Sequence, residues 1–280
     1  MKIITSITEM KTRAHSLRRE GKTIGFVPTM GFLHEGHLSL MDQARKESDI
    51  VVASIFVNPT QFGPGEDFDR YPRDEAGDQK KCNSAGVDIL FLPPAEEMYP
   101  GKPSVFVCVE EISDVLEGAI RPGHYRGVAT IVAKLFHIVQ PSWAYFGQKD
   151  YQQCVVIKRM VQELHMDVKI NIQPTIREES GLALSSRNSY LRTEERKTAS
   201  IIYRAMSAAH ALAKAGMRNS GELKDKVKAV LNEVSNISID YVEIVHPDSL
   251  FPIVYAKKGS VLLAAVRIGK TRLIDNIVLP

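Results

Sequence analysis

Short runs of β-branched and other apolar residues alternate with helix-like patterns along the first part of the chain. The runs that predict strands are residues 23–27, 50–57, 87–92, 104–109 and 168–176. Apolar residues at helical spacing lie between them, at residues 38–48, 75–85, 127–139 and 152–165. Because continuous apolar runs are typical of strands buried on both faces, this pattern predicts an α/β, doubly wound parallel sheet of Rossmann-like type.

The pattern changes after Ile176. Long helical segments at residues 193–215 and 220–236 begin at Thr193 and Ser220, the expected N-caps, and strand-like runs follow at residues 239–245, 260–266 and 272–278. This order predicts a Rossmann-like domain over residues 1–176 and a smaller α+β domain over residues 177–280. Ligands of a doubly wound sheet bind at the carboxyl ends of its strands, so we expect the functional residues there.

The composition is that of a globular protein with enough apolar residues for a sizeable core, at 44% hydrophobic and 25% charged over 280 residues. The formal charge of +3 comes from 36 basic and 33 acidic residues scattered along the chain, which indicates neither a nucleic-acid nor a membrane partner. The three cysteines lack a C-x-x-C pair, which argues against a disulfide framework or a zinc site. Without a signal-peptide core or a membrane-length apolar segment, a cytoplasmic location is expected.

A glycine-containing turn follows the first predicted strand and reads P-T-M-G-F-L-H-E-G-H over residues 28–37. Backbone N–H groups at such a strand–turn–helix junction can bind phosphate oxygens. His34 and His37 share one face of the first helical turn, and Gly36 permits the close approach of a nucleotide. We expect both imidazoles to stabilise a triphosphate as pyrophosphate leaves, although an isolated pair of this kind more often only caps and packs a helix start.

Other short motifs do not satisfy the geometry of the sites they suggest. The spacing of His34 and His37 is not the i, i+4 spacing of a zinc protease. The Gly-Lys-Thr segments at residues 21–23 and 269–271 lack the leading glycine of a P-loop.

Two hydroxyls and an arginine form a second motif, L-S-S-R-N at residues 184–188, which follows a polar loop containing Gly181. Serine hydroxyls and a guanidinium can neutralise phosphate charge that grows in a transition state. Alone, a serine-rich loop is more often a solvated turn. In combination with the two-histidine turn on an α/β sheet, it predicts an enzyme that handles ATP phosphates.

The two motifs together resemble the nucleotidyltransferase superfamily, and further runs resemble the pantothenate synthetase family. These runs are F-V-N-P-T-Q-F at residues 56–62, E-D at 66–67, Y-P-R at 71–73, F-G-Q-K-D-Y-Q-Q at 146–153 and, more loosely, L-I-D-N at 273–276. The resemblance implies an ATP-dependent condensation of pantoate with β-alanine. Its products would be pantothenate, AMP and pyrophosphate, formed through a pantoyl adenylate.

The resemblance also implies roles for individual residues. The groups that would stabilise the leaving pyrophosphate are His34, His37, Lys149, Ser185, Ser186 and Arg187. The pantoate site would comprise Gln61 and Gln153 for the hydroxyls and carboxylate, and Pro28, Met30 and Phe62 for the gem-dimethyl group. The ATP site would comprise Met30, His34, Gly36, His37, Gly147, Lys149, Asp150, Ile176, Leu184, Ser185, Ser186 and Arg187, with Asp150 at the ribose.

Further implications concern the metal, the second domain and the partners. Asp78 matches a family position associated with magnesium, and Mg²⁺ would enter with ATP as a co-substrate, with no tightly bound organic cofactor. Residues 121–126 would form a basic, mobile loop near the anionic ligands, and residues 177–280 a lid. ATP, pantoate and β-alanine are the expected ligands, and a homodimer formed through the N-terminal domain is expected, without nucleic acid or membrane.

Two other functions fit parts of the sequence. A nucleotidyltransferase acting on a phosphorylated alcohol would need a cationic clamp in place of Gln61 and Gln153, and its dinucleotide product would distinguish it. A non-catalytic nucleotide-binding module would not need the full set of histidines, lysine, serines and arginine. Pantoate-dependent consumption of ATP would exclude it.

Overall fold

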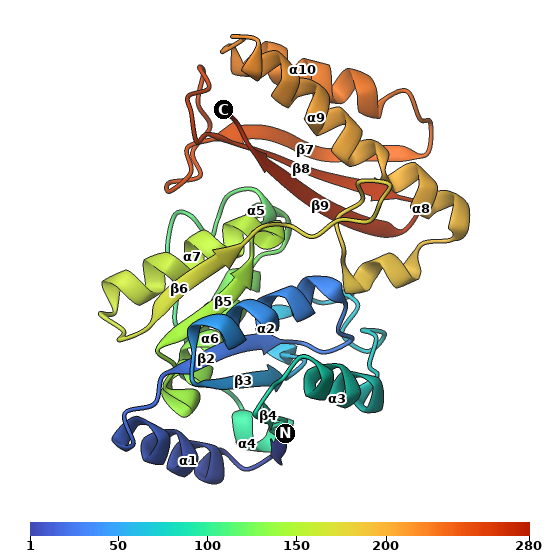
Figure 1. Cartoon of the computed structure of the whole chain (residues 1–280). Coiled ribbons are helices and arrows are strands. Elements are labelled where there is room, and N and C mark those ends of the chain that lie inside the picture. The colour runs from blue at the N-terminus through green and yellow to red at the C-terminus, as the bar shows by residue number, and fades with distance from the viewer. The chain divides into compact units, whose positions relative to one another are not determined.

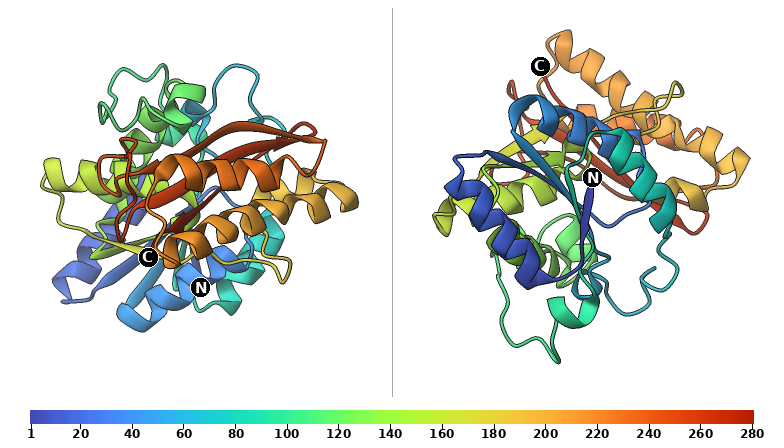
Figure 2. Two further views of the ribbon diagram at one scale, coloured as in Figure 1. Left: turned by 90° about the horizontal axis from the view of Figure 1, so that it is seen from above. Right: turned by 60° about the horizontal axis from the view of Figure 1, so that its bottom comes forward.

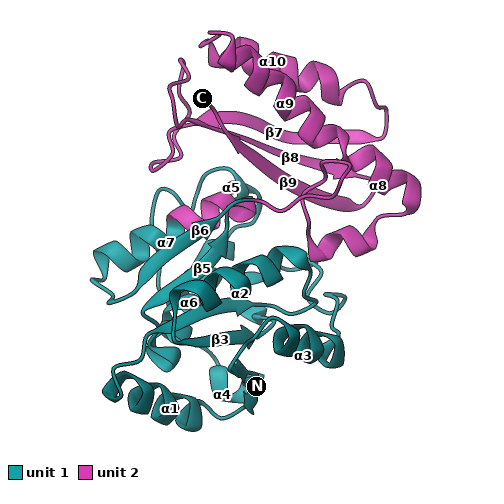
Figure 3. Cartoon of the chain, in the orientation of Figure 1, with its two compact units in different colours: residues 1–147, 156–174 teal, residues 148–155, 175–280 magenta.

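The computed structural model describes residues 1–280, which form two compact units (Figure 3). Unit 1 comprises Met1–Gly147 and Val156–Pro174, and unit 2 comprises Gln148–Val155 and Thr175–Pro280. The junction between Pro174 and Thr175 lies beside the division expected at residue 176, whereas the short segment Gln148–Val155 also groups with unit 2.

Unit 1 is built on a six-stranded sheet in which all paired strands are parallel (Figure 1). Its strands are β1 (Lys2–Ile4), β2 (Ile24–Thr29), β3 (Ile50–Ile55), β4 (Ile89–Phe91), β5 (Trp143–Gly147) and β6 (Lys169–Gln173), in the order β1-β4-β3-β2-β5-β6. From β2 the chain adds β3 and β4 on one side, and later β5 and β6 on the other. The predicted doubly wound sheet is therefore confirmed, and its switch point lies between β2 and β5.

Helices cover both faces of this sheet. They are α1 (Ile7–Arg19), α2 (Glu35–Glu47), α3 (Glu75–Ser84), α6 (His124–Val139) and α7 (Tyr151–Glu163), with the short α4 (Ala95–Met98) and α5 (Glu117–Ile120). Side chains alternate along β2: Val27 belongs to the core formed with Met41 of α2, whereas the Phe26 ring meets the Phe136 ring of α6 edge-on at 6.4 Å. Each face of the central strand is thus buried by a different helix.

Unit 2 contains an antiparallel sheet of β7 (Ile237–Val245), β8 (Val261–Ile268) and β9 (Thr271–Val278), in that order. Helices α9 (Ile201–Lys214) and α10 (Ser220–Leu231) pack on it, and Figures 1 and 2 show both lying along the sheet. The short α8 (Thr193–Ala199) precedes them. The predicted α+β architecture is confirmed.

Several local predictions differ from the structure. Residues 104–109 form no strand, because no neighbouring strand pairs with them; Val105 is 80% exposed, and the Val107 N–H donates to the Thr130 hydroxyl. The N-cap of α10 is Asn219, whose side chain accepts the Glu222 N–H, so Ser220 is the first helical residue. Arg192 precedes α8 in place of Thr193. None of the helices is both long and apolar enough to cross a membrane.

Candidate active site

The turn between β2 and α2 is held in shape by a buried carboxylate. Gly31 and Phe32 both have left-handed backbone conformations, with φ of 81° and 52°. The side chain of Asp78, in α3, accepts the N–H of Phe32 and the N–H of Leu33, both at 2.7 Å. A left-handed residue other than glycine costs about 1–2 kcal/mol, and two charge-assisted hydrogen bonds offset that cost at Phe32.

The residues present do not fit a magnesium ion held at Asp78. Its side chain is 1% exposed, burial raises the pKa of its carboxyl, and both of its oxygens already accept amide hydrogens. Mg²⁺ requires an octahedral shell of oxygen ligands that usually includes several waters. No group of three or more His, Cys, Asp or Glu side chains is arranged to hold a metal ion. Asp78 therefore shapes the turn, which corrects the expectation that it binds magnesium.

His34 and His37 lie together at the start of α2, with ring centroids 4.1 Å apart. His34 is the N-cap, and its Nδ1 accepts the Gly36 N–H at 3.2 Å. The Nδ1 of His37 accepts the His34 N–H at 3.3 Å. A neutral imidazole whose Nδ1 accepts carries its proton on Nε2, so both rings are set as Nε2–H donors.

The His34 ring lies directly beside Gly36. A Cβ at position 36 would lie 2.9 Å from Cε1 and 3.0 Å from Nδ1 of that ring, closer than side chains pack. The glycine therefore leaves space for the first histidine, in addition to the close approach of a nucleotide that is expected from sequence.

Gln61, at the end of the 3₁₀ turn η1 (Pro59–Gln61) after β3, is buried and its amide is oriented. The Tyr99 hydroxyl donates to Asn58 Oδ1 at 2.8 Å, and Asn58 Nδ2 donates to the Gly127 carbonyl at 3.1 Å and to Gln61 Oε1 at 3.0 Å. Since Asn58 Nδ2 can only donate, the atom of Gln61 that faces it is the oxygen. The NH₂ group of Gln61 lies 3.1 Å from the Met30 sulfur, which places these two predicted pantoate residues side by side.

A second cluster holds the main chain of Gln61. Arg121 forms a bidentate ion pair with Glu66, and its Nη1 lies 3.1 Å from His124 Nε2. His124 Nδ1 lies 2.8 Å from the Gln61 carbonyl oxygen. A carbonyl only accepts, so Nδ1 carries the proton and Nε2 accepts from Arg121. Burial, together with the Arg121 charge, lowers the pKa of His124 to about 4, consistent with a neutral ring.

This cluster corrects the expectation for residues 121–126. The Arg121 and Glu66 side chains are only 16% and 23% exposed, and His124 begins α6. The guanidinium of Arg126 lies over the Phe106 ring at 4.7 Å. Arg121 is thus a partly buried partner of Glu66 within unit 1, whereas Arg126 remains exposed.

The apolar residues expected around pantoate lie near the same strand ends. Pro28 is in β2 opposite Ser54, and Met30 follows that strand. The Phe62 ring packs edge-on against Phe68 and Tyr71, at centroid distances of 5.3 and 5.9 Å. These contacts fix the Phe62 ring from one side.

Three of the predicted residues, Lys149, Asp150 and Gln153, belong to the segment of unit 2 that follows β5. Gly147 ends β5, and the 3₁₀ turn η2 (Gln148–Asp150) carries Lys149 and Asp150. The Lys149 ammonium is 3.4 Å from the Asp150 carboxylate, and its side chain is 18% exposed. Gln153 is half-buried in the first turn of α7.

The second motif follows a small hairpin in unit 2. The Leu184 N–H donates to the Ile176 carbonyl at 3.0 Å, and the hairpin turns at Gly181, which has a φ of 89°. Ser185 caps the 3₁₀ turn η3 (Ser186–Tyr190) by accepting the Arg187 N–H at 3.3 Å. The loop expected from sequence is thus an ordered, capped turn.

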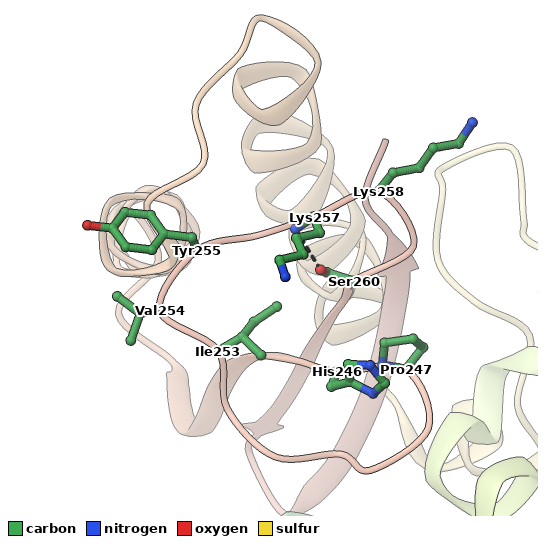
Figure 4. Close-up of a pocket in the computed structure, with 8 residues that line it drawn as sticks. All are labelled: His246, Pro247, Ile253, Val254, Tyr255, Lys257, Lys258 and Ser260. Atoms are coloured by element: carbon green, nitrogen blue, oxygen red, sulfur yellow. Dashed lines mark hydrogen bonds between the residues drawn. The ribbon is translucent and has the colours of Figure 1, made fainter.

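A pocket of about 370 Å³ lies elsewhere in unit 2 and contains none of the predicted site residues. Figure 4 shows that it is lined by residues of the 246–260 segment, among them His246, Tyr255 and Lys257. The Lys257 N–H donates to Ser260 at its edge.

Sequence reasoning missed several residues on which the predicted ones depend. Asn58 and Glu66 stand in the quoted motifs, but no role was expected for them, because what they do follows only from contacts across the fold. Asp78 was expected in a different role. Polar residues at buried positions, such as Asn58 at 1% exposure, are the signal that a sequence alone does not show.

A parallel sheet with a two-histidine helix start beside its switch point is the arrangement of a nucleotide-dependent α/β enzyme. The family model described as pantoate-beta-alanine ligase matches residues 2–278. The pantothenate synthetase of Caldicellulosiruptor saccharolyticus is 52% identical over 279 residues, covering 99% of both chains. That of Geobacter sulfurreducens is 50% identical over 279 residues, covering 100% of this chain and 99% of its own.

Solved structures agree with these relatives. The pantothenate synthetase of Thermus thermophilus superposes with a TM-score of 0.95 at 48% identity, over 100% of both chains. The pantoate-beta-alanine ligase of Francisella tularensis, complexed with beta-gamma ATP and beta-alanine, has a TM-score of 0.83 at 36% identity, covering 99% of this chain and 97% of its own. The chain belongs to the pantoate-beta-alanine ligase family, and it is a ligase of pantothenate synthesis.

Proposed function

We propose that the chain joins pantoate to β-alanine in two steps with ATP as the activating substrate. A carboxylate oxygen of pantoate attacks the α-phosphorus of ATP, the bond to pyrophosphate breaks, and pantoyl adenylate forms. The amine of β-alanine then attacks the acyl carbon, and AMP and a proton are released. Both steps proceed by direct attack, so no nucleophile from the protein is needed. The Francisella tularensis relative with ATP and beta-alanine ligands supports these two substrates.

The observation that carries the proposal is the orientation of the histidine pair. Both Nδ1 atoms accept backbone N–H groups, which sets both Nε2–H groups as donors. Donors fixed before the reaction stabilise charge without reorganising when pyrophosphate leaves. This orientation supports the proposed roles of His34 and His37 in phosphate binding.

Other groups complete the binding of the phosphates in this proposal. Lys149 bridges phosphate oxygens, and Ser185, Ser186 and Arg187 neutralise the leaving pyrophosphate. Asp150 binds the ribose. The remaining contacts to ATP come from Met30, Gly36, Gly147, Ile176 and Leu184. Mg²⁺ enters as the magnesium complex of ATP, with the phosphates as its ligands.

Pantoate is bound by the amides of Gln61 and Gln153 and by an apolar wall. The NH₂ group of Gln61 is the part free of Asn58, so it donates to the hydroxyl or carboxylate oxygens of pantoate. Pro28, Met30 and Phe62 contact the gem-dimethyl group.

The proposal extends to the setting in which the enzyme works. We propose that it is a cytoplasmic homodimer that associates through residues 1–176, with residues 177–280 as the lid. The family resemblance supports the dimer, and the free thiols of Cys82, Cys108 and Cys154 agree with a reducing compartment. Light scattering during gel filtration tests the dimer, and a monomer at working concentrations would contradict it.

The decisive experiment incubates the protein with ATP, Mg²⁺ and pantoate, with β-alanine added or withheld. Without β-alanine, mass spectrometry should detect pantoyl adenylate and pyrophosphate. With it, pantothenate and AMP should appear in equal amounts. Formation of ADP, or AMP formation that does not depend on pantoate, would contradict the proposed mechanism.

A further inference from the structure

Strand β9 carries two consecutive polar residues in a buried position. Asp275 is 4% exposed and Asn276 is 2% exposed. Polar side chains removed from water to this extent need partners inside the protein. Both have them in unit 2, and the partners belong to two segments that carry predicted phosphate-binding residues.

Asn276 holds the segment that carries Lys149. Its Nδ2 donates to the carbonyl oxygens of Gln148 and Lys149, both at 2.9 Å, and Gln148 Nε2 donates back to Asn276 Oδ1 at 3.2 Å. The side chain therefore uses both of its amide hydrogens on consecutive peptide groups of η2. The backbone from which the Lys149 ammonium extends is fixed to β9.

Asp275 holds the hairpin that leads into the serine motif. Both of its oxygens accept from Arg177, at 2.6 and 2.8 Å. The same guanidinium donates to the Gly181 carbonyl at 3.1 Å and lies 4.1 Å from the Tyr203 ring centroid. A planar guanidinium that is bidentate and stacked has one orientation, so the hairpin is fixed to β9 as well.

We infer that Asp275 and Asn276 are positioning residues that set the Lys149 ammonium and the Ser185–Arg187 turn in register with each other. Consecutive Cα atoms lie about 3.8 Å apart. Asp275 and Asn276 therefore anchor two segments that are distant in sequence to neighbouring positions on β9. The inference rests on the proposed phosphate roles of these groups. In this inference each β9 residue acts through the segment that it holds.

The first test replaces Asn276 by aspartate, which is nearly isosteric but cannot donate to the two carbonyls. We expect single-turnover formation of pantoyl adenylate from ATP and pantoate to fall about 10²-fold, the scale of a displacement of about 1 Å in a reacting group. Release of pantothenate from supplied pantoyl adenylate and β-alanine should change less than about threefold, because the triphosphate is absent from that step. Asn236→Asp, an exposed change of the same kind in unit 2, should alter neither rate.

A double-mutant cycle separates positioning from stability. If Asn276 acts through Lys149, Asn276→Asp in a Lys149→Ala background should reduce adenylation by less than about threefold more. Thermal unfolding of each variant shows that folded protein is being compared. Equal losses in both half-reactions, or a full additional loss in the Lys149→Ala background, would overturn the inference.

Arg177→Lys tests the contact between Asp275 and the hairpin, and it remains informative if Asn276→Asp does not fold. Lysine keeps the charge beside Asp275 but cannot make the bidentate pair. Adenylation should fall while the amide-forming step is retained. The loss should not add to that of Ser185→Ala. Additive losses would overturn the positioning role of Asp275. Failure of the wild-type chain to form any adenylate would contradict the proposed function, a result distinguishable from either outcome.

Discussion

The two ring nitrogens of His34 have different roles: Nδ1 caps the helix, and Nε2–H is the proposed donor to phosphate. A substitution can keep the cap and remove the donor. Asparagine is among the best N-cap residues and can accept the Gly36 N–H in place of Nδ1, but it has no atom at the position of Nε2. We therefore expect His34→Asn to unfold at the wild-type temperature while adenylate formation falls about 10²-fold or more. Thermal melting and single-turnover assays check the two halves of this prediction.

His137→Asn is the matched control, since His137 is exposed on α6. It should change neither measurement. A folded His34→Asn enzyme with near-normal adenylation would show that the helix start needs only a cap, and the phosphate role of the pair would be wrong.

Gln61 offers a donor to pantoate because Asn58 engages its oxygen. Gln61→Glu removes the donor and places a negative charge where an anionic substrate binds. We expect the KM for pantoate to rise by at least about tenfold, corresponding to about 1–3 kcal/mol of lost pairing, with little change in ATP affinity. Initial-rate kinetics with each substrate varied provide the measurement, and Gln162→Glu on the exposed side of α7 is the control. A selective loss of ATP affinity would show that Gln61 has been assigned to the wrong substrate.

At the scale of elements, α3 supports the start of α2 through one carboxylate. Asp78→Asn keeps one acceptor for the Phe32 and Leu33 N–H groups and turns an N–H donor toward the other. We expect a loss of about 1–3 kcal/mol in the free energy of unfolding and a lower rate of adenylation. Denaturant unfolding and single-turnover assays at increasing Mg²⁺ are the measurements. Full recovery of the rate at high Mg²⁺ in a variant of unchanged stability would restore the metal role.

The contact between η1 and α6 makes unit 1 sensitive to acid through His124. Its pKa is lowered to about 4 in the folded state from an ordinary value of 6.5, so between these values the unfolded chain binds a proton that the folded chain does not. The free energy of unfolding should therefore fall as the pH is lowered, by about 2 kcal/mol between pH 7 and pH 5 from this residue.

Urea unfolding at the two pH values, for wild type and His124→Asn, isolates this contribution. Asparagine can still donate to the Gln61 carbonyl but does not titrate. The variant should lose less stability on acidification than the wild type. Equal losses would show that His124 is not the group responsible.

Strands and helices with a strong internal pattern were predictable, and those that depend on a neighbour were not. Residues 50–57 and 127–139 were recognised because their own apolar patterns specify β3 and α6. Residues 104–109 have the same β-branched composition as a strand, but no neighbouring strand pairs with them, and the Val107 N–H donates to a side chain instead. The three-residue β1 has too little pattern to be noticed, and its place in the sheet is set by pairing with β4.

At the scale of the molecule, the reaction divides into two half-reactions that use charge differently. Lys149→Ala should block adenylation far more than amide formation, because the triphosphate that its ammonium neutralises is gone once pyrophosphate has left. Single-turnover comparison of pantothenate released from synthetic pantoyl adenylate with that formed from ATP and pantoate measures the difference. Equal losses in both assays would mean that Lys149 positions the intermediate.

The doubly wound class of the sheet was predictable from the alternation of strands and helices, but the order of its strands was not. Met30 and Gln61 were expected to share a ligand, and the structure places them in contact. The orientation of each group was not predictable. It depends on Tyr99, Asn58 and Gly127, which lie far apart in sequence and meet only in the fold.

The closeness of the His34 ring to Gly36 limits how these two positions can change in evolution. A Cβ at position 36 would lie 2.9 Å from Cε1 of the imidazole two residues earlier, so a lineage that gains a side chain there must move the His34 ring from its present position. In gene copies that are no longer selected for catalysis, this constraint is lifted from positions 34 and 36 at the same time. Divergent gene duplicates can therefore be sorted by this pair, since an alanine or larger residue at position 36 marks a lineage in which the first imidazole has already been displaced.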